Sequence, residues 1–124
     1  MIKYIDKNTY IGFDRALIVR KEWLDKILDP IDPKIWEMRT TKTNVRGTVG
    51  LIEAGSGLIV GSVEIVGCNP SPIPVDDMFY EEHKVKDVEL LRKWKFAWYL
   101  RNAKRFDKPI TYTHPKGDVI WVKI

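Results

Sequence analysis

The segment Leu58–Val66 constrains the fold of this chain more than any other stretch. It is apolar almost throughout, with two polar alternates, a pattern typical of a long buried strand. A Gly-Ser-Gly turn signal at residues 55–57 precedes it, and Thr48–Ala54 supplies a second strand before that turn. Gly61 inside the long strand indicates a bend or bulge, as the closure of a small barrel requires. The sequence therefore predicts two paired strands of a β-barrel.

Shorter elements surround this pair. Three prolines within residues 70–74 interrupt regular structure. Apolar runs and alternation predict further strands over 16–19, 35–40, from 96 onward and 118–124, and helical spacing predicts helices over 21–28, from Asp76 or Asp77 to His83, and over 87–94. We expect residues 1–14 to form a strand or an extended arm. The prediction is an α+β fold, with a small mixed β-barrel flanked by about three short helices in a single domain spanning 1–124.

Length and composition narrow the class of protein. A chain of 124 residues fits one hydrophobic core. The net charge of +4 favours polyanion partners such as RNA or DNA. Cys68 is the single cysteine, so the chain has no internal disulfide, and we expect this residue to be a small buried hydrophobe. The sequence has no apolar run of membrane-spanning length, and a cytoplasmic location without membrane association is expected.

The segment Lys34–Gly47 is dense in basic and hydroxyl side chains. Alternation within it places Glu37 and Arg39 on one face of a strand and Trp36 on the other. Lys34 follows a proline turn and can converge on the side of Glu37 and Arg39. These three side chains predict a site that reads an anion or a base. The alternative is an ordinary ion pair on a solvated face, which is worth little.

The segment Arg92–Lys108 interleaves basic and aromatic side chains. Basic side chains neutralise phosphates, and exposed rings stack on unpaired bases. Core packing also explains this pattern, because Phe96, Trp98 and Leu100 alternate; we expect Trp98 to be buried. The residues predicted to bind a ligand are Lys34, Trp36, Glu37, Arg39, Arg46, Tyr99 and Arg101. We expect the two histidines, His83 and His114, to lie at the surface.

The order of these features resembles the ASCH domain, a member of the PUA-like barrel superfamily. Lys34, Glu37 and Arg39, followed by an Arg-Gly pair at 46–47, resemble its Gly-x-Lys-x-x-Glu-x-Arg segment and Arg-Gly turn; Asp32 stands where that pattern has Gly. Further matching segments are 57–68, 96–106 with Pro109, and 117–121. The resemblance runs from about Arg15 to the end of the chain and implies a PUA-like barrel.

The resemblance also implies a ranking of functions. PUA-like barrels hold RNA or a flipped base in a cleft beside the barrel, so binding of single-stranded RNA, a nucleotide or a modified nucleobase ranks first. A ribonuclease ranks second. In that case Lys34 and Arg39 hold the scissile phosphate, and Glu37 acts as general base or helps to bind a divalent metal ion. No other cofactor is expected.

Two further functions remain open. Some ASCH proteins are amidohydrolases that deacetylate N4-acetylcytidine with a Lys and a Thr of the same motif and a Glu further along. This chain has Glu37 at the position of that Thr, and a carboxylate does not take over the role of a hydroxyl nucleophile. Lys34 could act alone as nucleophile or base if burial lowered its pKa. The fourth alternative is a module that binds a protein partner in transcription or RNA complexes.

Overall fold

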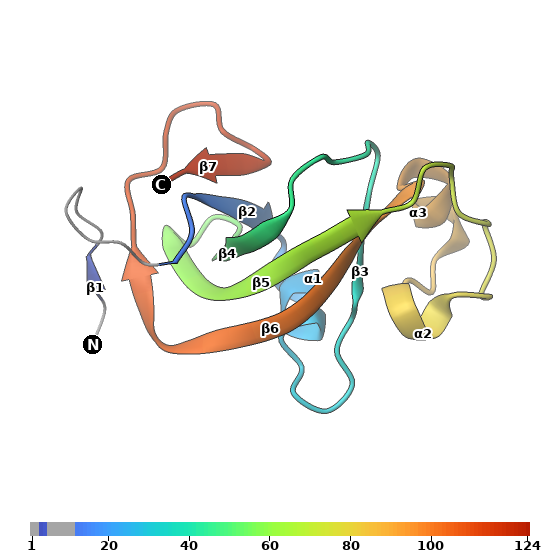
Figure 1. Cartoon of the computed structure of the whole chain (residues 1–124), viewed down its shortest axis with the longest axis horizontal. Helices are drawn as coiled ribbons and strands as arrows, with labels where there is room; N and C mark the ends of the chain where they lie inside the picture. The colour runs from blue at the N-terminus through green and yellow to red at the C-terminus, as the bar shows by residue number, and fades with distance from the viewer. Residues whose placement is uncertain (1–2, 5–11) are drawn as a thin grey trace.

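A computed structural model describes residues 12–124 and, as backbone, residues 3–4. Within these residues the chain forms one mixed sheet and three short helices (Figure 1). The strands are β1 (Lys3–Tyr4), β2 (Arg15–Val19), β3 (Trp36–Arg39), β4 (Gly47–Glu53), β5 (Leu58–Cys68), β6 (Phe96–Thr111) and β7 (Trp121–Lys123). The helices are α1 (Lys21–Ile27), α2 (Tyr80–His83) and α3 (Val88–Lys93). The expected α+β fold with a small barrel is confirmed.

The long strand β6 organises the sheet. The strand order is β1-β6-β5-β4-β2-β7, and β3 also pairs with β6. One edge of β6 carries β5, while the other edge carries β3 near its start and β1 near its end. The β2–β4 and β1–β6 pairs are parallel and the remaining pairs are antiparallel, so the sheet is mixed. The paired strands β5 and β6 curve together, which curls the sheet into its barrel shape (Figure 1).

A bulge in β5 helps to produce this curvature. Leu51 of β4 lies opposite Gly61, but the next residue, Ile52, lies opposite Ile59, so one residue of β5 is left unpaired. At Gly61 the backbone of β6 approaches so closely that a Cβ atom would lie 2.4 Å from the carbonyl oxygen of Lys104. The bulge expected from Gly61 is confirmed, with Val60 as the unpaired residue, and the close approach of β6 explains why position 61 is a glycine.

The main core lies between the sheet and α1. Leu24 and Ile27, on one face of α1, are fully buried against it. Trp98 of β6 is only 2% exposed, as expected, and Cys68 packs partly buried at the edge. The other buried members of this cluster are Leu17, Val19, Leu28, Val49, Leu51, Val60, Val63, Ile65 and Leu100. The helix α1 is therefore held by apolar packing.

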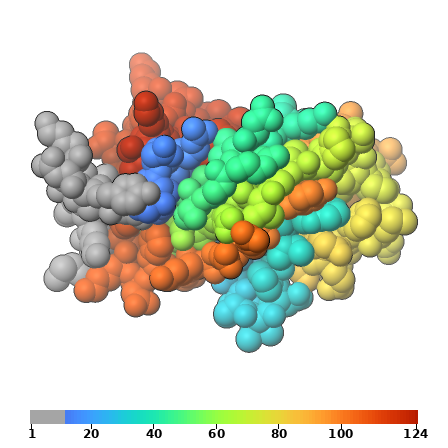
Figure 2. Space-filling view, in the orientation of Figure 1, coloured from blue at the N-terminus to red at the C-terminus, as the bar shows by residue number. Residues whose placement is uncertain are grey.

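The helices α2 and α3 cover the end of the molecule where β3 pairs with β6 (Figure 1). A separate cluster of buried side chains joins α3 and the segment that follows α2 to the sheet; it is formed by Met38, Ile73, Val85, Leu91 and Ala97. Asp87 caps α3, accepting a hydrogen bond of 2.9 Å from the backbone N–H of Glu89. The loop between α1 and β3 protrudes from the body of the molecule (Figure 2). Because α3 packs near β3, it can supply side chains to a site built on that strand.

Several elements are shorter than the sequence predicts. The helix expected from Asp76 or Asp77 begins at Tyr80, because the Asp76 side chain accepts the backbone N–H of Met78 in a turn. The last strand covers 121–123 of the predicted 118–124. Of the predicted N-terminal arm, Lys3–Tyr4 pairs with β6, and residues 1–2 and 5–11 lie outside the described part. No helix in the described part of the chain is long and apolar enough to span a bilayer.

Candidate functional site: a pocket around Lys34

A pocket of about 240 Å³ lies where α1, β3 and α3 meet. We call it the Lys34 pocket. Its walls contain charged and aromatic side chains from these three elements and from the residues that flank them. The lining residues are Arg20, Trp23, Lys34, Glu37, Met38, Arg39, Leu90, Lys93 and Trp94. The structure thus brings the three central residues of the predicted site together.

Lys34 is almost completely buried, with 2% of its surface exposed. Its ammonium donates a hydrogen bond to the backbone carbonyl of His83, which lies 49 residues further along the chain. The ammonium also lies 5.1 Å from the centre of the Trp23 ring, a cation–π contact. Lys34 lies in the loop between α1 and β3, and its ammonium is held in place by contacts with α1 and α2.

Glu37 and Arg39 form a hydrogen-bonded ion pair beside Lys34. Glu37 is 4% exposed, and its Oε2 accepts hydrogen bonds of 3.0 and 2.8 Å from Nε and Nη2 of Arg39. Nη2 of Arg39 also donates to the carbonyl of Ile18 at 3.0 Å, and the guanidinium lies 5.5 Å from the centre of the Trp98 ring. The alternation that predicted a shared face for this pair is correct. Other parts of the protein cover this face, so the pair is not the ordinary ion pair on a solvated face that was the alternative.

Burial changes the protonation of Lys34. It lowers the pKa of Lys34 to about 8, against the attraction of Glu37, whose Oε1 lies 3.9 Å from Nζ. The nearby charge of Arg39 lowers the pKa further. Lys34 is therefore mainly an ammonium at pH 7 and loses its charge within a pH range where most lysines keep theirs.

His83 lies directly behind Lys34 and is not at the surface. It is fully buried, because α2 packs its imidazole inward, so the surface position expected for it is wrong. Its Nδ1 accepts the backbone N–H of Val85 at 2.9 Å, which places the proton on Nε2. Burial lowers the pKa of His83, and the Lys34 charge lowers it further. His114, by contrast, is exposed and bonds the Tyr112 hydroxyl at 2.8 Å.

The family model of the ASCH domain matches residues 17–110. The chain belongs to the ASCH domain family. ASCH domains are PUA-like modules, a class associated with RNA binding, and the small barrel described above fits that fold. The match contains every residue that lines the Lys34 pocket. No curated protein matches the chain.

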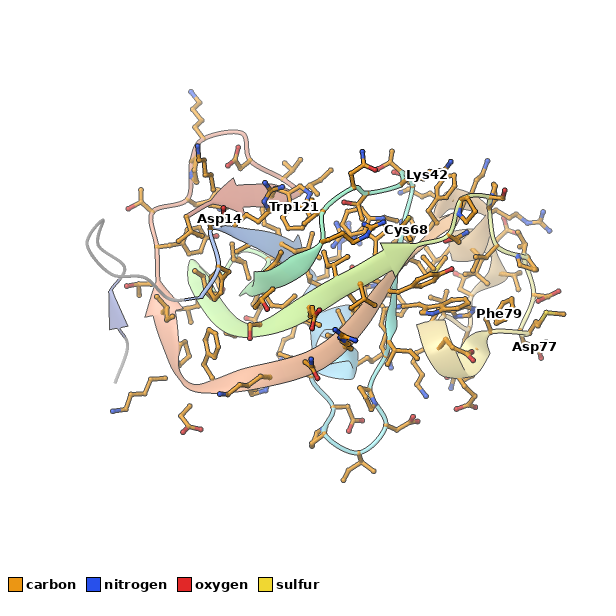
Figure 3. All side chains as sticks on the ribbon, in the orientation of Figure 1. Asp14, Lys42, Cys68, Asp77, Phe79 and Trp121 are labelled. Atoms are coloured by element: carbon orange, nitrogen blue, oxygen red, sulfur yellow. The ribbon has the colours of Figure 1, made fainter. Side chains whose placement is uncertain are left out.

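The other residues predicted to form the site of this ASCH domain lie elsewhere. Trp36 and Tyr99 contact each other with ring centres 5.3 Å apart, and Trp36 also contacts Phe79 at 4.9 Å, away from the pocket lining. Phe79 lies beside α2, far from Trp121 at the other side of the barrel (Figure 3). These rings form a small aromatic cluster of their own.

The two remaining arginines are also separate from the pocket. Arg46 donates to the carbonyls of Thr43 and Val45, at 3.0 and 2.8 Å, and lines a different cavity next to β4. Arg101 forms two hydrogen bonds of 2.9 Å with the Glu64 carboxylate on the neighbouring strand. Both side chains already have acceptors, so neither is free to extend the site without breaking these bonds.

Six residues that line the ASCH domain pocket, among them two tryptophans, were not predicted as site residues from the sequence. Trp23 and Trp94 contact edge to face, with ring centres 5.6 Å apart, and line the pocket together with Arg20 and Lys93. Both rings lie within the predicted helices 21–28 and 87–94, where apolar side chains at helical spacing indicate burial but not a shared cavity. No sequence signal joins them, because they come from two helices that meet only in the tertiary structure.

The described residues contain no group of three or more His, Cys, Asp or Glu side chains arranged to hold a metal ion. Glu37 is the carboxylate in the pocket lining, and Arg39 already occupies one of its oxygens with two hydrogen bonds. The pocket therefore presents several cations, two indole rings and one carboxylate that is hydrogen-bonded to Arg39.

Proposed function

We propose that this ASCH domain binds single-stranded RNA and holds one base, native or modified, in the Lys34 pocket. The observation that carries the proposal is the burial of Lys34 and Glu37 in the wall of a cavity that two tryptophans also line. Burying two ionisable groups is costly for stability, and such groups cluster at binding and catalytic sites.

The size of the pocket supports a single base as the occupant. Its volume of about 240 Å³ is below the range of roughly 300–1,000 Å³ typical of pockets for drug-sized molecules. Trp23 and Trp94 offer aromatic surface to a flat ring, and base–aromatic stacking contributes about 1–3 kcal/mol per base. These two rings thus stack on the base, whereas the ligand-binding aromatic residues predicted from the sequence were Trp36 and Tyr99.

Polar groups of the pocket suit the edge of a base. The Lys34 ammonium has three N–H donors, one of which goes to the His83 carbonyl, and the Arg39 bonds to Glu37 and Ile18 use Nε and Nη2. The remaining donors can meet carbonyl and ring-nitrogen acceptors of a base. Oε1 of Glu37 is an acceptor next to them, so donors and an acceptor lie side by side, as on a base edge.

Fluorescence anisotropy of a short labelled single-stranded RNA, at low and moderate salt, tests this function. We expect wild-type protein to raise the anisotropy and Lys34→Met to weaken binding by about tenfold, the loss of about 1.4 kcal/mol. Methionine keeps the apolar stem, and Glu37 keeps both bonds to Arg39, so the variant should fold. Lys86→Met removes the same charge from an exposed position outside the pocket lining and serves as the control.

Unchanged RNA affinity of folded Lys34→Met would defeat the assignment of the pocket. No binding at any salt concentration would defeat the proposed function itself. A loss equal in Lys34→Met and Lys86→Met would show that net charge, and not the pocket, controls binding.

The lowered pKa of Lys34 favours a second candidate, a hydrolase that acts on RNA or on a modified nucleoside. A lysine whose pKa is about 8 supplies neutral amine near physiological pH, as a nucleophile or general base must. In the same titration, a fall of anisotropy below the value of free RNA identifies cleavage. Mass spectrometry of N4-acetylcytidine incubated with the protein identifies loss of the acetyl group.

A further inference from the structure

The pocket of this domain carries a marked excess of positive charge. Among the described residues that line it, four are cations, namely Arg20, Lys34, Arg39 and Lys93, and one, Glu37, is an anion. Glu37 is already shared between two of these cations, since it accepts two hydrogen bonds from Arg39 and lies 3.9 Å from the Lys34 ammonium. No carboxylate of the lining therefore remains for the other two.

Arg20 and Lys93 are the two cations left over. Both side chains are exposed at the rim, and neither forms an ion pair or hydrogen bond with the side chain of any residue that the structure describes. Neighbouring surface cations differ: Lys21 pairs with Asp25, and Arg92 with Glu89. The rim cations are thus available to an incoming anion.

The position of Arg20 is not explained by helix stability. It occupies the N-cap of α1, where its side chain makes no capping bond. A cation there also opposes the helix dipole, which favours negative charge at this end. Lys93, by contrast, lies in the last turn of α3, where a cation is favoured. One comes from the N-cap of α1 and the other from α3, and both line the same pocket.

We propose that Arg20 and Lys93 form a phosphate subsite, so that the Lys34 pocket takes a nucleotide in preference to a nucleoside or a free base. The inference rests on the proposed function, because it assigns the base to the interior and the phosphate to the rim. Guanidinium and ammonium groups bind phosphate oxygens through charge-assisted hydrogen bonds, the strongest class of such bonds. The negative charge of the phosphate offsets the excess positive charge of the lining.

The experiment compares nucleosides with their 5′-monophosphates by NMR titration of the whole chain labelled with ¹⁵N. The indole N–H signals of Trp23 and Trp94, assigned with tryptophan-to-phenylalanine variants, report on the pocket and detect weak binding. We expect the monophosphate of the preferred base to bind at least about tenfold more tightly than its nucleoside. The double variant Arg20→Gln/Lys93→Gln should remove this difference, because the monophosphate loses at least about tenfold more affinity than the nucleoside does.

A matched control separates a local subsite from general electrostatics. Arg92→Gln/Lys95→Gln removes the same two residue types from exposed positions beside Lys93 that do not line the pocket. We expect this control to keep the preference for the monophosphate. The Arg92–Glu89 pair that it breaks is exposed and contributes little to stability.

Each outcome decides the inference. Equal affinity for nucleoside and monophosphate in the wild type would overturn the phosphate subsite while leaving the base pocket intact. A preference that survives in Arg20→Gln/Lys93→Gln, or that disappears equally in the control, would also overturn it. If neither ligand class shifts the Trp23 and Trp94 signals, the pocket is not a nucleotide site, and both the subsite and the proposed function fail.

Discussion

The ammonium nitrogen of Lys34 lies 3.9 Å from Oε1 of Glu37, and both side chains are almost fully buried. The other carboxylate oxygen is bonded to Arg39, so one carboxylate serves two cations. Removing two charges from water costs more than their attraction returns unless further polar groups assist. Here the His83 carbonyl and the Trp23 ring provide that assistance to Lys34.

The stability of the protein should rise with pH between about 8 and 10.5 because of Lys34. Its folded-state pKa is about 8 and its ordinary value is 10.5, so in this range the unfolded chain holds a proton that the folded chain has released. Stability increases with pH wherever the unfolded state binds more protons. Between these pH values the free energy of unfolding of wild type should rise by about 3 kcal/mol relative to that of Lys34→Met, which lacks the titrating amine. Each unit of pKa shift corresponds to about 1.4 kcal/mol.

Urea denaturation of both proteins at several pH values measures this gain. Other titrating groups are common to the two proteins and cancel in the difference between their free energies of unfolding. A difference that stays constant from pH 7 to pH 10.5 would show that Lys34 is not desolvated in solution.

RNA affinity should fall as the pH rises through the pKa of Lys34. Below about pH 8 the ammonium can donate to a base and attract phosphate, and above it the neutral amine does so weakly. We expect wild type to lose affinity between pH 7 and pH 9, measured by anisotropy. Lys34→Met should bind weakly with no such step, and an identical step in both proteins would assign it to another group.

Arg39→Gln should destabilise the fold by about 3 kcal/mol, because it removes both hydrogen bonds from a buried carboxylate. Glu37→Gln/Arg39→Gln should recover part of this loss, since the amide is neutral. Denaturation of both single variants and the double variant forms a double-mutant cycle that yields the coupling between the two positions. Additive free energies would indicate that the two side chains do not interact in solution.

Trp98→Ala should mainly lower stability, whereas Trp94→Ala should mainly lower RNA affinity. The Trp98 ring is buried, contacts Trp121 with ring centres 5.9 Å apart, and donates to the Thr41 carbonyl at 2.9 Å. Its loss should cost about 3–5 kcal/mol. Trp94 is only partly buried, so its loss should cost less stability and weaken RNA binding. Equal melting temperatures for the two variants would contradict this division.

Gly61→Ala should destabilise the protein by about 1–3 kcal/mol, because its Cβ atom would lie 2.4 Å from a backbone oxygen of Lys104 that cannot rotate away. Ser62→Ala, on the next residue of β5, meets no such obstacle and is the control. Urea denaturation measures both. A stable Gly61→Ala would mean that the bulge relaxes away from β6.

The sequence by itself determined features that depend on neighbouring residues. Strand alternation placed Glu37 and Arg39 on one face, the Asp87 cap started α3, and the glycine at position 61 marked the bulge. Alternation also predicted the burial of Trp98 correctly. These features follow from backbone geometry and side-chain direction, which repeat every two residues in a strand and every 3.6 in a helix.

Tertiary structure alone decided which of these residues share a site. Lys34 is buried because its ammonium meets a carbonyl 49 residues away and a ring on α1, and no local pattern encodes such a contact. Arg101 was also predicted from the sequence to bind a ligand, but the register of β5 and β6 places Glu64 opposite it, and the two side chains form an ion pair. A basic side chain is long and flexible, so its role depends on the partner that folding brings within reach, and that partner lies elsewhere in the chain.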